Sequence, residues 1–113
     1  MGESYSTLVV QPIDLIRAFK VDFCLASVIK WMTKWHMERK TEYLTRAKYY
    51  INLCENTECP VGFLFSLRMY CILNGFMTKD AQSCLLMDVC TNILKGDTGS
   101  ASFLLLKGWA DGH

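Results

Sequence analysis

Residues 11–53 read QPIDLIRAFKVDFCLASVIKWMTKWHMERKTEYLTRAKYYINL, and this stretch decides the fold that we expect. Pro12 suits the first position of a helix, which should end near residue 20. Asp22 suits the N-cap of a second helix with a wide apolar surface, and Thr41 suits the cap of a third. The segment 36–40 is too polar to continue a core helix. The second and third helices are therefore expected to form a helical hairpin.

The rest of the chain also favours helices. Residues 61–73 form a nearly all-apolar segment that ends at Asn74-Gly75, a good left-handed C-cap pair, and we expect it to be the central helix. Thr78 is a candidate cap for a further helix ending at Gly96. The sequence predicts a small all-α single domain. Its expected parts are a short extended arm or strand up to Val10, the hairpin 11–53, an apolar helix pair 60–96 and a docking tail 99–113.

Composition and charge exclude several classes of protein. Half of the residues are hydrophobic and the net charge is +1, which argues against a disordered chain and against a nucleic-acid partner. The sequence holds no run of roughly 18 apolar residues and no secretory signal, so we expect a cytosolic protein with no membrane partner. The large aromatic side chains are more numerous than one small core can cover. We therefore expect a homo-oligomer.

Six cysteines are interpreted as thiols rather than as a disulfide scaffold, because free cysteine behaves as a small hydrophobe in apolar helices. Only two histidines accompany them, and the spacing suits no zinc site. We expect no metal and no cofactor. His36 is interpreted as a solvated residue at a helix end. Four cysteines lie inside apolar helical patterns: Cys24, Cys71, Cys84 and Cys90.

Basic residues concentrate in the first half of the chain. Lys30 and Lys34 share one side of the second helix, with Ser27 one turn before Lys30. Such a stripe can donate hydrogen bonds to phosphate oxygens, or it can be the solvated face of an amphipathic helix. Both interpretations remain open from the residues alone. The basic residues before position 50 are Arg17, Lys20, Lys30, Lys34, Arg39, Lys40, Arg46 and Lys48.

The order of motifs in residues 11–53 resembles the SaV-like proteins, a small phage-encoded family that includes a nucleotide kinase of lytic phages. The motifs are PID at 12–14, FCLASVIKW at 23–31, and EYLTRAKYY at 42–50. The pair AS at 26–27 stands where the family has Gly-Asn. The resemblance implies nucleotide handling in the cytosol of a host cell. The ligand-binding residues that it implies are Ser27, Lys30, Trp31, Lys34, Arg46 and Tyr50.

Catalytic motifs are scarce. A glycine-rich phosphate loop is missing, Pro60 follows the pair Glu55 and Glu58 too closely for a helical magnesium site, and no nucleophile can be paired with His36 from spacing. We therefore expect a phage-type accessory protein that sequesters a host-defence signalling nucleotide without turnover. One alternative is a nucleoside monophosphate kinase without that loop. A further alternative is an inhibitor that binds a host protein.

Overall fold

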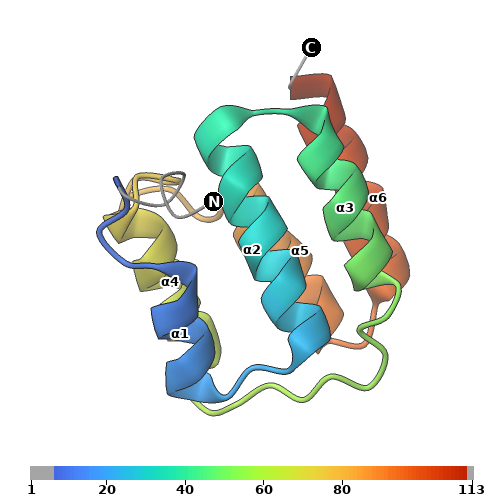
Figure 1. The fold of residues 1–113 in the computed structure, drawn as a ribbon, viewed down its shortest axis with the longest axis horizontal. Coiled ribbons are helices and arrows are strands. Elements are labelled where there is room, and N and C mark those ends of the chain that lie inside the picture. Colours follow the sequence, from blue (N-terminus) through green and yellow to red (C-terminus); the bar gives the residue numbers. More distant parts are fainter. Residues whose placement is uncertain (1–6, 112–113) are drawn as a thin grey trace.

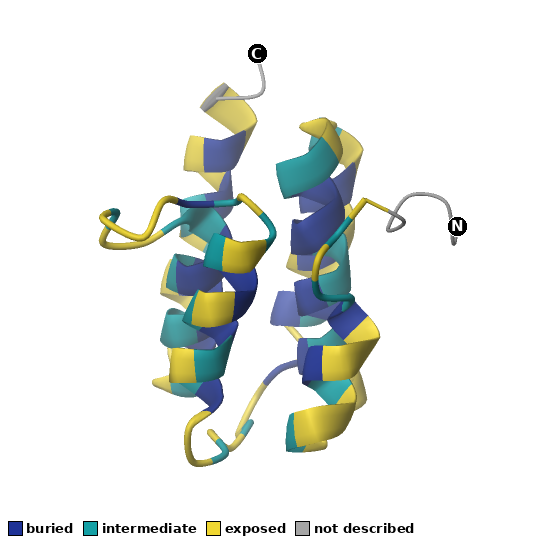
Figure 2. Ribbon diagram, turned by 90° about the vertical axis from the view of Figure 1, so that its left-hand side faces the viewer, coloured by how far each residue is buried: buried dark blue, intermediate teal, exposed yellow. Residues whose placement is uncertain are grey.

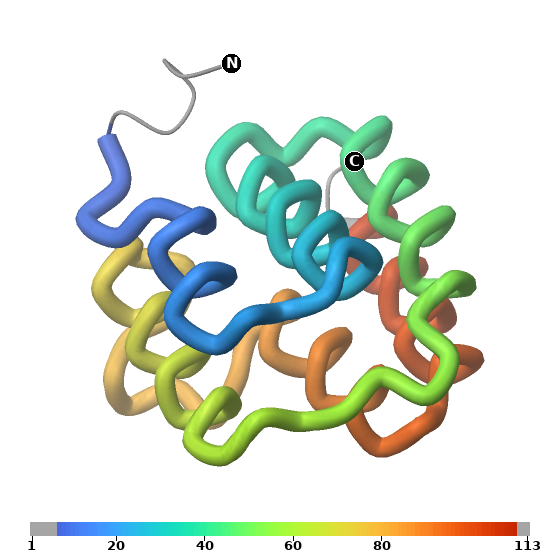
Figure 3. The backbone as a smooth tube through the Cα atoms, turned by 60° about the horizontal axis from the view of Figure 1, so that its bottom comes forward, coloured from blue at the N-terminus to red at the C-terminus, as the bar shows by residue number. Residues whose placement is uncertain are grey.

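The computed structural model describes residues 7–111, and every regular element in that range is a helix. The six helices form two layers of three (Figures 1 and 3), in which α1 packs on α4, α2 on α5 and α3 on α6. The first half of the chain makes one layer and the second half makes the other. The predicted all-α fold is confirmed. The helices are α1 (Pro12–Phe19), α2 (Phe23–Glu38), α3 (Thr41–Ile51), α4 (Phe63–Leu73), α5 (Leu85–Leu94) and α6 (Thr98–Asp111).

The first two helices begin where local signals place them. Pro12 occupies the start of α1, and the Asp14 carboxylate accepts a hydrogen bond of 3.2 Å from the Gln11 amide. Helix α1 ends because Lys20 adopts a left-handed conformation, with φ 51°. Asp22 caps α2 through a 2.8 Å hydrogen bond that its carboxylate accepts from the Leu25 amide. Both starts agree with the sequence prediction.

Helix α2 continues to Glu38, beyond the break expected at residue 36. There the half-buried His36 side chain packs against the second layer. Its imidazole stacks on the Phe76 ring, with centroids 4.9 Å apart and planes inclined by 12°, and its Nδ1 atom is buried. The interpretation of His36 as a solvated residue is therefore wrong.

Helices α2 and α3 lie side by side and run in opposite directions (Figure 1). Only Arg39 and Lys40 separate them. Arg39 ends α2 with a left-handed φ of 57°, and its guanidinium lies 4.2 Å from the centre of the Trp35 ring. Lys40 is the N-cap of α3, so Thr41 is the first helical residue rather than the predicted cap.

Helix α4 lies at the edge of its layer, and the prediction that it is the central helix is wrong. Helix α2 holds the central place, because it packs against α1, α3 and α5. The outward side of α4 leaves Phe65, Met69 and Leu73 exposed. An all-apolar sequence could not show which of its sides meets the core.

No helix begins at Thr78, another departure from the sequence prediction. The chain from there to Cys84 is a loop, and α5 begins at Leu85 with Cys84 as its N-cap. Arg68 of α4 holds this loop, because its guanidinium donates hydrogen bonds of 2.8–3.1 Å to three backbone carbonyls. The accepting carbonyls belong to Lys79, Ala81 and Gln82.

Helices of both layers carry buried residues, which are dark blue in Figure 2. The tail forms α6, which docks on α3 and α5. At Gly108 helices α5 and α6 of the second layer approach closely, since an added Cβ would lie 2.5 Å from Leu85 Cδ2. The largest fully buried side chains are those of Trp35, Tyr70 and Phe63.

The start of the described chain is fixed by one side chain of α4's C-cap. The Asn74 amide oxygen accepts a 3.0 Å hydrogen bond from the Val10 amide, and its NH₂ group donates one of 2.9 Å to the Val10 carbonyl. The expected extended arm falls largely in residues 1–6, outside the described residues. None of the helices within residues 7–111 is long and apolar enough to cross a membrane.

Candidate functional site

Three cationic side chains surround the indole ring of Trp31. Lys30 Nζ lies 5.0 Å from the ring centre, Lys34 Nζ 5.7 Å and Arg46 Cζ 5.0 Å. The lysines belong to α2 and the arginine to α3, so the packing of these two helices assembles the group. These distances are within cation–π range. Lys30, Trp31, Lys34 and Arg46 are called the cationic cluster below.

Tyr43 covers part of the Trp31 ring. The two rings are stacked, with centroids 5.9 Å apart and an interplanar angle of 24°. Lys34, only 5% exposed, has its Nζ atom 5.4 Å from the Tyr43 ring. Burial and the neighbouring Glu38 carboxylate, which accepts a hydrogen bond from the phenol, raise the pKa of Tyr43. Trp31 is thus a platform for cations rather than a free surface for a base.

Lys30 and Arg46 are the two more accessible cations of the cluster, and the described chain places no carboxylate beside them. Among the described residues, no carboxylate oxygen is found within 4.0 Å of Lys30 or Arg46, whereas Lys40 Nζ lies 3.6 Å from Glu38 Oε1. Like charges gathered around one ring repel each other, and an anion bound near both reduces that repulsion. The cationic cluster therefore favours an anionic ligand.

An apolar cleft between α1 and α2 adjoins the cationic cluster. Its volume is about 270 Å³, and Lys30 belongs to both the cleft and the cluster. Ser27, which is 6% exposed, contributes a polar group to the same cleft. The lining residues are Gln11, Pro12, Ile13, Ile16, Phe23, Ala26, Ser27 and Lys30.

Tyr50 lies farther along the same pair of helices. Its ring packs edge-on against Phe23, with centroids 5.8 Å apart, and against Tyr49 at 5.1 Å. Phe23 is 72% exposed and lines the cleft, so an exposed aromatic ring stands at the end of the cleft that adjoins Tyr50. Phe23 was not among the predicted ligand-binding residues.

The structure thus joins four of the six predicted residues directly and connects the other two through neighbours. Ser27 shares the cleft with Lys30, and Tyr50 reaches the cleft only through Phe23. The residues missed were Phe23 and the apolar wall from α1. Phe23 carries a usable signal, since it precedes Ser27 by four residues and so lies on the same side of α2. The residues of α1 that line the cleft carry no such sequence signal, because their position depends on how α1 packs.

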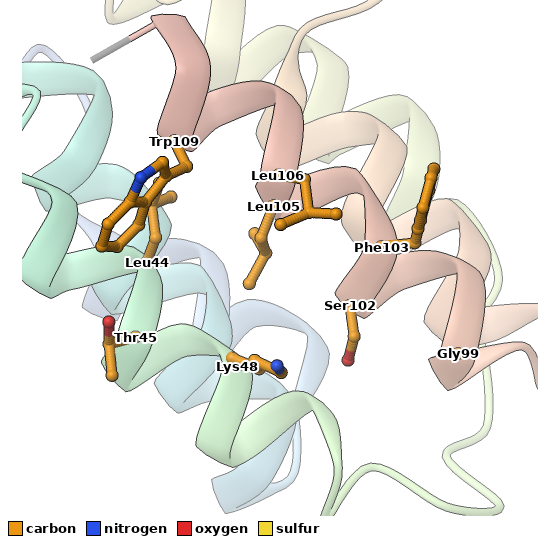
Figure 4. A pocket seen from close by; sticks show the side chains of 9 residues that line it. All are labelled: Leu44, Thr45, Lys48, Gly99, Ser102, Phe103, Leu105, Leu106 and Trp109. Atoms are coloured by element: carbon orange, nitrogen blue, oxygen red, sulfur yellow. The ribbon is translucent and has the colours of Figure 1, made fainter. Parts of the chain in front are cut away.

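A larger groove of about 610 Å³ separates α3 from α6 on the other side of α3 (Figure 4). Trp109 lies over Leu44 at one end of this groove, while Phe103 points away from Lys48 at the other. The surface is largely apolar, with Phe103 and Leu106 exposed. None of the predicted ligand-binding residues lines this groove.

Searches with protein-family models, curated proteins and solved structures found no match to the chain.

Proposed function

We propose that the chain binds a nucleotide on the surface formed by α1, α2 and α3 and holds it without turnover. The observation that carries the proposal is the cationic cluster beside an apolar cleft that ends at an exposed aromatic ring. The similarity of residues 11–53 to SaV-like proteins supports the same assignment. It also supports a phage protein in the host cytosol that sequesters a defence-signalling nucleotide.

The phosphate would lie between Lys30 and Arg46. Lys30 of α2 and Arg46 of α3 each place their charged group 5.0 Å from the centre of the Trp31 ring, so one anion near that ring could interact with both. Lysine and arginine donate charge-assisted hydrogen bonds to phosphate oxygens, and an anion between them removes their mutual repulsion. Charge pairing of this kind stabilises the bound nucleotide itself, so it increases the affinity for that nucleotide.

The base would occupy the α1–α2 cleft against Phe23. A volume of about 270 Å³ is at the small end of ligand-pocket sizes, which suits one base and its sugar better than a polymer. Base stacking on an exposed aromatic ring contributes on the order of 1–3 kcal/mol. Ser27 supplies a polar group for the edge of a base.

Sequestration is favoured over transfer because neither the cleft nor the cationic cluster contains a histidine or a carboxylate that could act as a general base. The alternative is a nucleoside monophosphate kinase, which the family resemblance supports. Formation of a nucleoside diphosphate from ATP and a monophosphate would decide for that alternative.

The experiment is a thermal-unfolding and calorimetry screen against inorganic phosphate and against mono-, di-, tri- and cyclic nucleotides. A ligand that binds the native state raises the melting temperature. We expect at least one nucleotide to bind. Lys30→Ala should weaken that binding about tenfold to a hundredfold, because it removes a charge-assisted contact.

The matched control is Lys95→Ala, which removes an exposed lysine from the opposite layer and should leave affinity unchanged. Phe23→Ala should weaken nucleotide binding while sparing inorganic phosphate. A protein that binds no nucleotide, or whose binding is unaltered by Lys30→Ala, would refute the proposal.

We also propose that the chain self-associates, through the exposed apolar side of α4. Phe65, Met69 and Leu73 follow one another at intervals of four residues and so form a single ridge. Capture of a host protein by the apolar α3–α6 groove is the alternative partner. The groove's exposed Phe103 and Leu106 favour it.

A further inference from the structure

The groove between α3 and α6 lies apart from the proposed nucleotide site, and its volume of about 610 Å³ is within the range of small-molecule pockets. Its α6 residues run from 99 to 109, about 15 Å along the helix axis. Contacts between α3 and α6 border the groove at two places. The Ser102 hydroxyl donates a 3.3 Å hydrogen bond to Asn52 Oδ1, and a Cβ added to Gly108 would lie 3.3 Å from Leu44 Cδ1.

The lining of the groove changes from apolar to polar along its length (Figure 4). Leu44 and Trp109 lie at one end, and Leu105 continues the apolar surface from there. Farther along, the Lys48 side chain of α3 points toward the side of the groove that carries Ser102. The two helices thus present an apolar surface followed by a polar end with one cation.

Large apolar side chains border the groove without being covered by the rest of the described chain. Leu106 is 62% exposed and Trp109 is 46% exposed, although buried Leu105 lies next to them in the same lining. Contiguous apolar surface of this kind marks a binding site more often than an ordinary solvated face. A hydrocarbon chain laid along the groove would remove that surface from water, which favours binding.

Lys48 gives the groove a positive charge that lacks an acidic partner. Among the residues that line the groove, Lys48 is charged and none is an aspartate or a glutamate. Within the described chain no carboxylate oxygen is found within 4.0 Å of its Nζ atom. An apolar ligand that carries one carboxylate therefore complements both the apolar surface and the charge.

We propose that the α3–α6 groove binds a free medium-chain fatty acid. The hydrocarbon chain lies against Leu105, Leu106 and Trp109, and the carboxylate lies near Lys48. The length of the lining suits an extended chain of about ten carbons. One groove with one cation suits a single chain with a single carboxylate, rather than a membrane lipid with two chains. This ligand is distinct from the nucleotide proposed for the α1–α2–α3 surface.

The first test is a calorimetric titration of the full-length chain with hexanoate, octanoate and decanoate, each below its micelle-forming concentration. A CH₂ group that is fully removed from water improves affinity by about fourfold. Because the groove is open to solvent on one side, we expect about twofold for each CH₂ group. Decanoate should therefore bind roughly 15-fold more tightly than hexanoate.

The second test separates the charge from the chain. Uncharged 1-decanol should bind the wild type about threefold more weakly than decanoate, which is the size of an exposed ion pair. Lys48→Ala should abolish this difference, because the cycle of ligand and residue isolates the pair. Lys95→Ala is the matched control, since Lys95 is also an exposed lysine but does not line the groove. It should preserve the difference.

A third measurement locates the ligand on the unaltered chain. In ¹H–¹⁵N spectra, decanoate should shift the indole signal of Trp109 and leave that of Trp31 in the cationic cluster unchanged. Three results would overturn the proposal: a shift of Trp31 instead of Trp109, equal affinities for hexanoate and decanoate, or a preference for decanoate over decanol that survives Lys48→Ala. Absence of decanoate binding would also overturn it, and attachment to phosphatidylcholine vesicles in that case would assign the groove to a membrane surface.

Discussion

A hydrogen bond between Thr33 of α2 and Tyr70 of α4 joins the two layers. Their hydroxyl oxygens lie 2.7 Å apart, and both residues are buried. Thr33→Val keeps the shape of the side chain but removes one partner. We expect a loss of about 1–3 kcal/mol in the free energy of unfolding, measured by urea denaturation.

Thr45→Val is the matched control for that substitution. Thr45 lies on the exposed side of α3 and no internal hydrogen bond of its side chain is found in the described chain, so its change should cost less than about 0.5 kcal/mol. Equal losses for the two variants would show that the Thr33–Tyr70 contact adds nothing to stability.

Arg68 has a larger structural role than its half-exposed position suggests. Its guanidinium donates to three carbonyls of the loop that precedes Cys84, a geometry that the single ammonium of lysine cannot reproduce. Arg68→Lys should lower the free energy of unfolding by about 1–2 kcal/mol. It should also speed amide hydrogen exchange in residues 79–84.

Arg17→Lys provides the comparison, because Arg17 is exposed on α1 and its guanidinium makes no side-chain hydrogen bond found in the described chain. Its exchange pattern should match the wild type. If Arg68→Lys leaves exchange in residues 79–84 unchanged, another contact holds that loop.

At the scale of the helices, α6 begins with a titratable cap. The Asp97 carboxylate accepts hydrogen bonds from the Ser100 hydroxyl at 2.6 Å and from the Ser100 amide at 2.9 Å, and these lower the pKa of Asp97 below its ordinary 3.8. A carboxyl group whose pKa is lower in the folded state stabilises that state at pH values above its unfolded pKa. This contribution is lost as the pH falls through the folded pKa.

Asp97→Ala should therefore lower the melting temperature at neutral pH, and the difference from wild type should shrink as the pH falls below about 3.8. Asp97→Asn keeps a capping oxygen without the charge, so its difference from Asp97→Ala should vary little over the same range. A wild-type advantage over Asp97→Ala that is constant from neutral to acidic pH would show that the carboxylate does not act as a cap.

Helix boundaries were predictable where the signal lies within a few residues of the boundary. Pro12 and Asp22 act on their own first turns, so the starts of α1 and α2 followed from the sequence. The start of α5 did not, because it depends on Arg68 from another helix. The burial of His36 depends on Phe76, which lies 40 positions later in the chain, and no local pattern records that contact.

The candidate site divides in the same way. Helical spacing on α2 placed Lys30 and Lys34 on one side, whereas Trp31 and Arg46 were predicted only from the motif resemblance of residues 11–53. The α1–α2 cleft was not predictable, since it arises from the angle at which α1 meets α2.

Helix α2 contributes to two separate cavities of the whole molecule. The cationic cluster and the cleft lie beside α1 and α3, in the first layer. The end of α2 and the second layer form the other cavity, whose volume is about 370 Å³.

The outer side of α4 gives the prediction that belongs to the whole molecule. Phe65 is 71% exposed, and Met69 and Leu73 extend the same ridge. Two copies of such a ridge can interdigitate about a two-fold axis, since i±4 ridges pack into one another at a crossing angle near −50°.

We expect sedimentation and light scattering to give a mass that rises from monomer to dimer with concentration. Phe65→Glu should keep the protein monomeric with an unchanged far-UV spectrum. Phe103→Glu is the matched control, because it adds the same charge at an equally exposed position on α6. This variant should leave the dimer intact. Dissociation by Phe103→Glu alone would move the interface to the α3–α6 groove, and a wild-type monomer at all concentrations would refute self-association.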